Sequence, residues 1–282
     1  MGPADLLHES VDVGAGLAAA VSVLAFFAAA CGDDDPITAT DDTSEADHDA
    51  MDDDVVEFKG QDVPTIDIGV VADSAGGINI AVRTTNYTIA ARSASTEHAE
   101  GEGHFHLYID GEKVLRFYNE WIYVAGVTEG DVEIMVELSA NDHRAYARDG
   151  DRLYAMTTFS VPDHTHDAHS HDEPIEVEFA GPVPTLSVEV LPDPKSGYNA
   201  FIKVDGIVLS GDHASQEPVD GEGHLNIYVN GQKIGRLYGG ATHIGALPEG
   251  DLEIMVAAYS NDHQPYVVDG QPVEAQTTIT VG

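Results

Sequence analysis

Cysteine and positive charge are both scarce in this sequence, and each shortage excludes something. A single cysteine, Cys31, cannot form a disulfide within the chain, so we expect none in the fold. Only 12 Lys and Arg stand against 50 Asp and Glu, which gives a formal net charge of −38 at pH 7. A chain this acidic repels phosphate backbones, so we expect no nucleic-acid partner. Hydrophobic residues make up 43%, which is enough to build buried cores.

The single cysteine follows an unbroken apolar run from Val13 to Ala30 that ends in small residues. This order is typical of a bacterial lipoprotein signal, so we predict a signal segment at 1–31 and acylation of Cys31. Ala28 replaces the usual large aliphatic residue, and no Lys or Arg precedes Lys59. An uncleaved membrane anchor and a cleaved signal without lipid therefore remain as alternatives. In each case we expect the bulk of the chain outside the cytoplasm, in the periplasm or at the cell surface.

Two segments of the chain are copies of each other. EGEGHFHLYIDGEKVLRFY at 100–118 aligns with DGEGHLNIYVNGQKIGRLY at 220–238, a constant offset of 120 positions. The register predicts two domains, repeat 1 (55–161) and repeat 2 (175–282). An acidic linker at 32–54 precedes them, and its composition predicts disorder. A second linker, at 162–174, reads PDHTHDAHSHDEP between the repeats.

Each repeat has the two-residue period of β-strands. Phe105, Leu107 and Ile109 alternate with polar residues, and Asp110-Gly111 then supplies the dipeptide of a two-residue hairpin turn. About seven short strands in about 100 residues, with frequent turns, are typical of an immunoglobulin-like sandwich. We therefore predict an all-β chain of two tandem immunoglobulin-like antiparallel β-sandwich domains.

The strand at 104–110 carries the chain's most suggestive chemical pattern. His104 and His106 are two residues apart, so both rings leave the face opposite the apolar one. If the strand at 132–138 runs antiparallel beside it, Asp142 and His143 arrive close to His104. Imidazole pairs of this kind bind copper or zinc, with Asp142 as a further ligand or as the acceptor for a ring N–H. The same residues can instead cap turns.

Repeat 2 offers a second candidate site at His224, Asp262 and His263. Asn226 stands where repeat 1 has His106, and His243 is available to complete the set, so this site is weaker, differently completed or vestigial. The linker between the repeats adds loose metal ligands with an ordinary imidazole pKa, so its binding should be lost below about pH 6. These linker residues are His164, His166, His169 and His171.

The string G-x-G-H-x-H-[LI]-Y-x-[DN]-G, followed by the N-D-H strand exit, resembles a group of exported bacterial immunoglobulin-like domains of unknown function. Residues 101–111, 129–136 and 141–143 carry the resemblance, together with their copies in repeat 2. The resemblance implies an exported β-sandwich and a metal site, without a known activity. The His-x-His strand is also loosely similar to the copper strand of Cu/Zn superoxide dismutases, but that family's bridging histidine and zinc loop are missing.

Two functions compete at this point. The first is a lipid-anchored protein that handles copper or zinc. The second is a structural or interaction module of the cell envelope, with an envelope protein as partner and with its acidic loops stabilised by Ca²⁺. No Ser/His/Asp or Cys/His arrangement stands out, so we expect no enzyme.

Overall fold

The computed structural model describes residues 54–163, 175–176 and 183–282. The predicted signal segment with Cys31, nearly all of the acidic linker and the four linker histidines lie outside these residues. Within them, no helix is long and apolar enough to cross a membrane. The described residues of both repeats belong to one compact unit.

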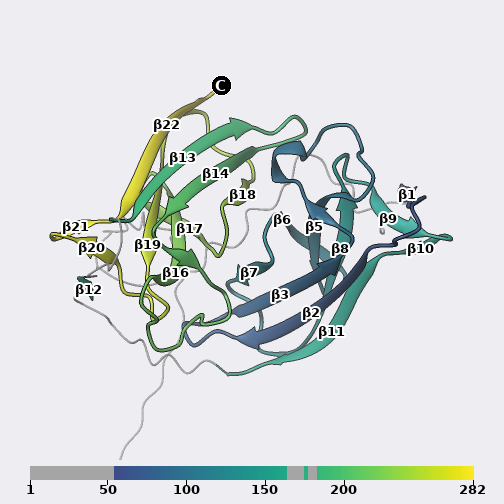
Figure 1. Cartoon of the computed structure of the whole chain (residues 1–282), viewed down its shortest axis with the longest axis horizontal. Helices are drawn as coiled ribbons and strands as arrows, with labels where there is room; N and C mark the ends of the chain where they lie inside the picture. The colour runs from purple at the N-terminus through teal and green to yellow at the C-terminus, as the bar shows by residue number, and fades with distance from the viewer. Residues whose placement is uncertain (1–53, 164–174, 177–182) are drawn as a thin grey trace, which may run out of the picture. The chain divides into compact units, whose positions relative to one another are not determined.

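Repeat 1 consists of eleven strands and one short 3₁₀ helix, shown in purple to teal in Figure 1. They are β1 (Val55–Glu57), β2 (Thr65–Ala72), β3 (Ile78–Thr85), β4 (Thr88–Ile89), η1 (Ala91–Ser93), β5 (Glu102–Ile109), β6 (Glu112–Phe117), β7 (Trp121–Val124), β8 (Gly130–Ala140), β9 (Ala145–Arg148), β10 (Asp151–Arg152) and β11 (Tyr154–Val161).

Repeat 2 has the matching strands in the same order. They are β12 (Ile175–Glu176), β13 (Thr185–Pro192), β14 (Tyr198–Asp205), β15 (Val208–Leu209), β16 (Glu222–Val229), β17 (Gln232–Leu237), β18 (Ala241–Ile244), β19 (Gly250–Tyr259), β20 (Tyr266–Val268), β21 (Gln271–Pro272) and β22 (Glu274–Val281). Most begin 120 positions after their counterparts, as Thr185 does after Thr65. The internal copy in the sequence is therefore a copy of the fold.

In each repeat, two antiparallel sheets enclose a core, which confirms the predicted immunoglobulin-like sandwich. In repeat 1, the order β6-β5-β8-β11 forms one sheet and β2-β3-β7 the other. Repeat 2 repeats this with β17-β16-β19-β22 and β13-β14-β18. A bridge between Leu237 and Ile122 joins β17 of repeat 2 to β7 of repeat 1.

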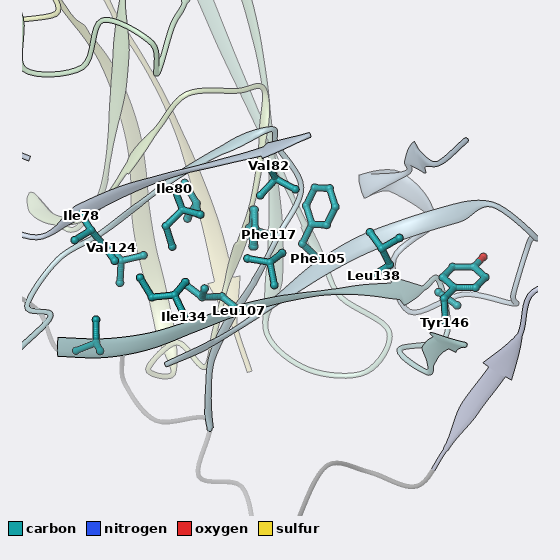
Figure 2. Packing of buried hydrophobic residues seen from close by; sticks show 14 of the residues in the cluster. Ile78, Ile80, Val82, Phe105, Leu107, Phe117, Val124, Ile134, Leu138 and Tyr146 are labelled. Atoms are coloured by element: carbon teal, nitrogen blue, oxygen red, sulfur yellow. The ribbon is translucent and has the colours of Figure 1, made fainter. Parts of the chain in front are cut away.

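Each repeat has its own hydrophobic core, built from the apolar positions that the period of two predicts. In repeat 1, Phe105 and Leu107 of β5 pack with Ile80 of β3 and Ile134 of β8, and all four are fully buried (Figure 2). Burial of each such side chain contributes about 1.5–3 kcal/mol. Repeat 2 builds its core from the matching strands, for example with Leu225 and Ile254.

The hairpin between β5 and β6 forms at the predicted dipeptide. Asp110 and Gly111 have φ of 51° and 81°, as a two-residue turn of this type requires. The second glycine of the G-x-G string has another role, because a Cβ on Gly103 would lie 1.8 Å from the carbonyl oxygen of Ser139 in β8. The glycine therefore lets β5 approach the end of β8 closely, which brings the start of β5 beside the turn after β8.

The pairing on which the predicted site depends is present. β5 and β8 are antiparallel, with His104 opposite Ser139 and His106 opposite Glu137. The turn after β8 therefore returns past the start of β5 and carries His143 with it.

Candidate metal centre

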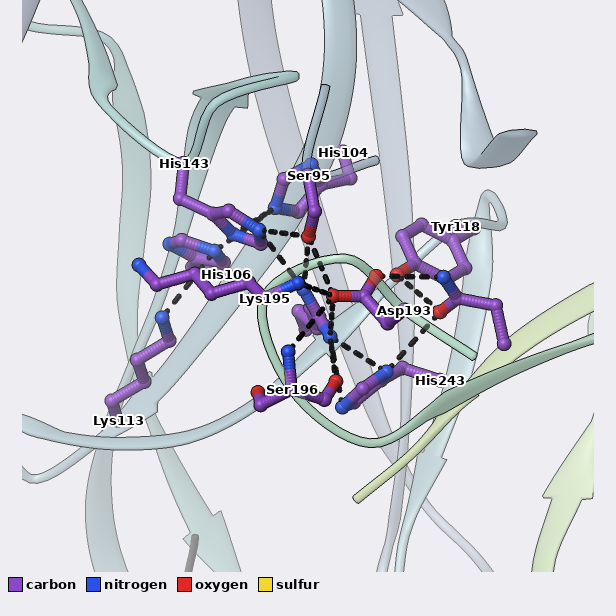
Figure 3. A network of polar contacts seen from close by, with 12 residues as sticks. Ser95, His104, His106, Lys113, Tyr118, His143, Asp193, Lys195, Ser196 and His243 are labelled. Atoms are coloured by element: carbon purple, nitrogen blue, oxygen red, sulfur yellow. Dashed lines mark hydrogen bonds and ion pairs between the residues drawn. The ribbon is translucent and has the colours of Figure 1, made fainter. Parts of the chain in front are cut away.

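Three histidines of repeat 1 meet with their ring nitrogens turned toward one another (Figure 3). His104 and His106 come from β5, and His143 comes from the turn between β8 and β9. The Nε2 atom of His104 lies 3.1 Å from Nε2 of His106 and 3.1 Å from Nδ1 of His143. One nitrogen from each ring lies within 4.8 Å of the others. We call these three residues the histidine cluster.

The histidine cluster is far more buried than an outward-facing strand position suggests. His104 and His106 are 0% and 2% exposed, although they face away from the core of repeat 1. The rings leave the face opposite the apolar one, as predicted, but that face is covered. Arg116 and Tyr118 lie against the cluster, and residues of repeat 2 complete the cover, as described below.

Burial keeps the cluster uncharged. Desolvation, followed by repulsion from His143, holds the pKa of His104 well below its usual value. Desolvation and the ammonium group of Lys113 do the same for the pKa of His106. Desolvation and Arg116 lower the pKa of His143 to about 3. At neutral pH all three rings are therefore neutral, which is the form that binds a metal ion.

Two residues of β8 hold the ring of His106 from behind. The hydroxyl of Ser139 lies 2.8 Å from Nδ1 of His106, and a carboxylate oxygen of Glu137 lies 3.9 Å from the same atom. Arg152 in turn donates a 2.8 Å hydrogen bond to Glu137. Such contacts orient an imidazole and fix which nitrogen faces the metal position.

His143 is held by a network that includes repeat 2. Its Nε2 atom lies 2.7 Å from Oγ of Ser95, and that hydroxyl donates a 2.7 Å hydrogen bond to Oδ1 of Asp193 in repeat 2. Arg116 lies between them, with Nη2 3.2 Å from Oδ1 of Asp193 and Nη1 3.0 Å from Nε2 of His143. Figure 3 shows Asp193, Ser196 and His243 of repeat 2 gathered around this network.

Asp142, the fourth predicted residue of this site, does not join the cluster. Its carboxylate accepts hydrogen bonds of 2.7 Å and 3.0 Å from the guanidinium of Arg144. The carboxylate of Asp142 is thus paired with a residue outside the histidine cluster. Among the described residues, its hydrogen bonds go to Arg144 and not to a cluster imidazole.

The predicted site of repeat 2 is less complete. His224 and His263 lie together with ring centroids 5.1 Å apart, but Asp262 instead accepts a hydrogen bond from Ser260. Among the described residues, Nε2 of His224 and Oδ1 of Asn226 have no hydrogen-bond partner. Only repeat 1 gathers three metal-ligating side chains within the described part of the chain.

His243 does not complete the second site. Its ring lies 2.8 Å from Nη2 of Arg116 and 3.2 Å from Oδ1 of Asn199, so it belongs to the network around repeat 1. Desolvation and Arg116 lower the pKa of His243 to about 3. Of the alternatives for the second site, completion by His243 therefore receives no support, because the ring of His243 contacts Arg116 and Asn199.

Sequence patterns did not reveal the residues that surround the cluster. Ser95, Arg116 and Asp193 are each matched 120 positions away, by Ser215, Arg236 and Asp73. This identity between the copies was the available signal, but it does not show that each Asp would meet the Arg of the other repeat.

Two of the three nitrogen–nitrogen distances in the cluster approach the spacing that a small transition-metal ion requires. Zinc bound tetrahedrally by histidine at about 2.0–2.1 Å requires ligand nitrogens about 3.3 Å apart. The two contacts of His104, at 3.1 Å each, come close to that spacing. Three neutral imidazoles are also a donor set that copper accepts. The residues therefore fit copper or zinc better than Ca²⁺, which requires oxygen ligands.

Comparisons with known proteins add little to this geometry. No family model matches the chain, and no characterised protein matches its sequence. Among solved structures, the fibronectin(III)-like modules of Clostridium thermocellum CbhA align at 15% identity and a TM-score of 0.23, covering 77% of this chain and 94% of that one. The central fibronectin-III array of RIM-binding protein aligns at 10% identity and a TM-score of 0.22, covering 79% and 62%. These TM-scores are too low to bear on function.

Proposed function

We propose that the chain is an exported protein, lipid-anchored through Cys31, that binds one copper or zinc ion at His104, His106 and His143. The observation that carries the proposal is the convergence of three neutral imidazoles from two segments, two of them buried and the third, His143, half-buried. The protein delivers or sequesters the ion and is not an enzyme. Membership in the exported domain group that the G-x-G-H-x-H string resembles is part of the same proposal.

Comparison of the two repeats supports a specific role for His106. Where repeat 2 has Asn226 in place of His106, it also has Ala257 in place of Glu137 and Tyr259 in place of Ser139. Repeat 1 therefore has the imidazole together with the carboxylate and the hydroxyl that orient it, and repeat 2 has other residues at all three positions. A histidine that only filled space would not need a matched carboxylate and hydroxyl behind it.

Two features of the site oppose cation binding and favour the alternative, an interaction module without a metal. Nζ of Lys113 lies 3.4 Å from Nε2 of His106, and Arg116 touches His143, so positive charge lies beside the metal position. Among the described residues, Nδ1 of His104 has no hydrogen-bond partner, and binding through Nε2 leaves an unsatisfied N–H there at about 1–3 kcal/mol. The favourable free energy of metal binding must exceed the cost of the charge repulsion and of the unsatisfied N–H together.

Titration calorimetry of the chelator-stripped chain with Cu(II) and Zn(II) tests the proposal. We expect one ion per chain with sub-micromolar affinity, and loss of that binding in His106→Asn, which installs the residue of repeat 2. A matched control replaces all four linker histidines and should leave the binding unchanged. Because burial keeps the cluster neutral in acid, binding should also persist at pH 5.5.

The result that contradicts the proposal is equally definite. Binding that disappears with the linker histidines but survives His106→Asn assigns the metal to the linker. No binding by either part of the chain leaves the interaction module as the function.

A further inference from the structure

The two repeats exchange the same set of contacts in both directions. Arg116 of repeat 1 meets Asp193 of repeat 2 at 3.2 Å, and Arg236 of repeat 2 meets Asp73 of repeat 1 at 2.7 Å. Tyr118 donates to Asn199 at 2.9 Å, and Tyr238 donates to Asn79 at 3.0 Å. Each repeat thus covers the histidines of the other with one aspartate-bearing turn.

That turn delivers a fully buried carboxylate to the histidine cluster. Asp193 is 0% exposed at its side chain, and its Oδ1 atom accepts the backbone N–H groups of Lys195 and Ser196 as well as the hydroxyl of Ser95. Its Oδ2 atom accepts a 2.7 Å hydrogen bond from Asn199. These hydrogen bonds fix the orientation of the Asp193 carboxylate.

The hydroxyl of Ser95 has only one hydrogen, and Asp193 takes it. Oγ can therefore only accept from its other neighbours, which are Nε2 of His143 at 2.7 Å and Nη1 of Arg116 at 3.2 Å. Nη1 of Arg116 also lies 3.0 Å from Nε2 of His143, but it can direct its hydrogen to Oγ instead. The shorter contact, 2.7 Å between Oγ and Nε2, would be repulsive without a hydrogen between the two atoms, so Nε2 donates to Oγ. A neutral His143 that donates from Nε2 has a lone pair on Nδ1, the atom that faces His104. This is the tautomer that a metal ligand binding through Nδ1 requires.

The protonation of His104 is compatible with the same assignment. Its Nδ1 atom is buried and, among the described residues, without a hydrogen-bond partner. A buried N–H without an acceptor is rarely tolerated, so the proton of His104 belongs on Nε2. That N–H needs an acceptor, and Nδ1 of His143 and Nε2 of His106 each lie 3.1 Å away, so a lone pair on Nδ1 of His143 is compatible with it.

We propose that Asp193 of repeat 2 positions the metal ligand His143 of repeat 1 through the hydroxyl of Ser95, so that the metal centre is complete only when both repeats are docked. We call Asp193, Ser95 and His143 the trans relay. The inference rests on the proposed function for its metal, although the tautomer of His143 is a property of the metal-free chain. Asp193 and Ser95 are positioning residues and do not touch the ion.

The chain carries its own matched control. Ser215 lies 2.8 Å from Nε2 of His263, and Oδ1 of Asp73 lies 3.9 Å from the same nitrogen, so the matching residues gather around repeat 2 without a third histidine. Ser95 and Ser215 also share a left-handed backbone, with φ of 62° and 57°. Ser95→Ala and Ser215→Ala therefore make the same local change, and only the first touches the histidine cluster.

The experiment has two readouts on the full chain. Long-range ¹⁵N–¹H correlation spectra of the histidine-labelled, metal-free protein at pH 7 report which nitrogen of His143 carries the proton. We expect Nε2 in the wild type and Nδ1 in Ser95→Ala, because without the hydroxyl Arg116 becomes the partner of Nε2. Zinc affinity should fall about 10- to 100-fold in Ser95→Ala and stay near wild type in Ser215→Ala.

Asp193→Asn and Asp73→Asn form a second matched pair in case one serine variant does not fold. A wild-type His143 protonated at Nδ1, or a tautomer unchanged in Ser95→Ala and Asp193→Asn, overturns the inference. Equal loss of zinc affinity in both members of a pair also overturns it. If the wild type binds no metal, the proposed function fails, and the tautomer spectra still decide whether the trans relay exists.

Discussion

At the residue scale, His143 adopts a backbone conformation that its side chain does not favour. Its φ is 72°, in the left-handed region, at the end of the three-residue turn from Asn141 to His143. Gly or Asn usually occupies such a position, and other residues cost of order 1–3 kcal/mol. A smaller residue would therefore fold more easily at this position, as it would at His263 in repeat 2, where φ is 70°.

His143→Asn should therefore separate stability from metal binding. We expect the free energy of unfolding to change by no more than about 1 kcal/mol, because relief of the backbone offsets the lost ring contacts, while the cluster loses its metal. Urea denaturation and metal titration measure the two effects. His263→Asn, at the matching turn with φ of 70°, is the control and should leave metal binding intact. Metal binding retained by His143→Asn would exclude this residue as a ligand.

The three histidines of the cluster were predictable because their positions depend on strand period and antiparallel register alone. His104 and His106 share a face through the period of two, and His143 follows from the pairing of β5 with β8. Their burial was not predictable, since Asp193 and its turn lie about 90 residues further along the chain than His104. The partner of Asp142 was not predictable either: its carboxylate pairs with Arg144, two residues away.

At the element scale, the pair β5–β8 and its copy β16–β19 differ at the positions that support a third ligand. Tyr259 stands where Ser139 lies in repeat 1, and its ring stacks on His224 with centroids 5.7 Å apart and planes at 16°. An aromatic ring here occupies the space beside residue 226, so a histidine at that position alone would lack both room and a hydroxyl partner.

Restoring both residues should therefore build a second site. In Asn226→His/Tyr259→Ser, we expect metal stoichiometry to rise from one to two ions per chain, because His224 and His263 are already adjacent. Calorimetry with zinc gives the stoichiometry, and Asn226→His alone is the control that should stay near one. A double variant that folds and still binds one ion would show that repeat 2 lacks more than these two side chains.

Strand prediction located the long strands β5 and β8 and missed the shortest ones. The eight-residue β5 and the eleven-residue β8 show the period of two clearly. The two-residue strands β4 and β10 are too short to show any period, and they form because tertiary neighbours pair with them.

At the scale of the whole molecule, the contact between the repeats holds a large share of the buried charge. Arg116 and Arg236, two of only 12 basic residues in the chain, lie within it and neutralise Asp193 and Asp73. The pKa of Asp193 is lowered because hydrogen bonds from Ser95 and its own turn outweigh burial. Removing one member of such a buried pair typically costs about 3–5 kcal/mol.

The neutral histidines around this contact should make the metal-free protein sensitive to acid. Burial lowers the pKa of five of them in the folded state: His104, His106, His143, His224 and His243. In the unfolded chain each returns to about 6.5, so below that pH the unfolded state binds more protons than the folded state. The stability that these groups contribute is complete above pH 6.5 and is lost progressively as the pH falls.

We therefore expect the free energy of unfolding to decrease between pH 7 and pH 5, by up to about 1.4 kcal/mol per pH unit for each histidine. Urea denaturation of the chelator-stripped chain at several pH values measures this slope. His243→Tyr, which installs the residue found at the matching position Tyr123, removes one titrating group and should reduce the slope without touching the cluster. A slope of zero would mean that the folded and unfolded states bind the same number of protons between pH 7 and pH 5. The five rings would then not be held neutral in the folded state.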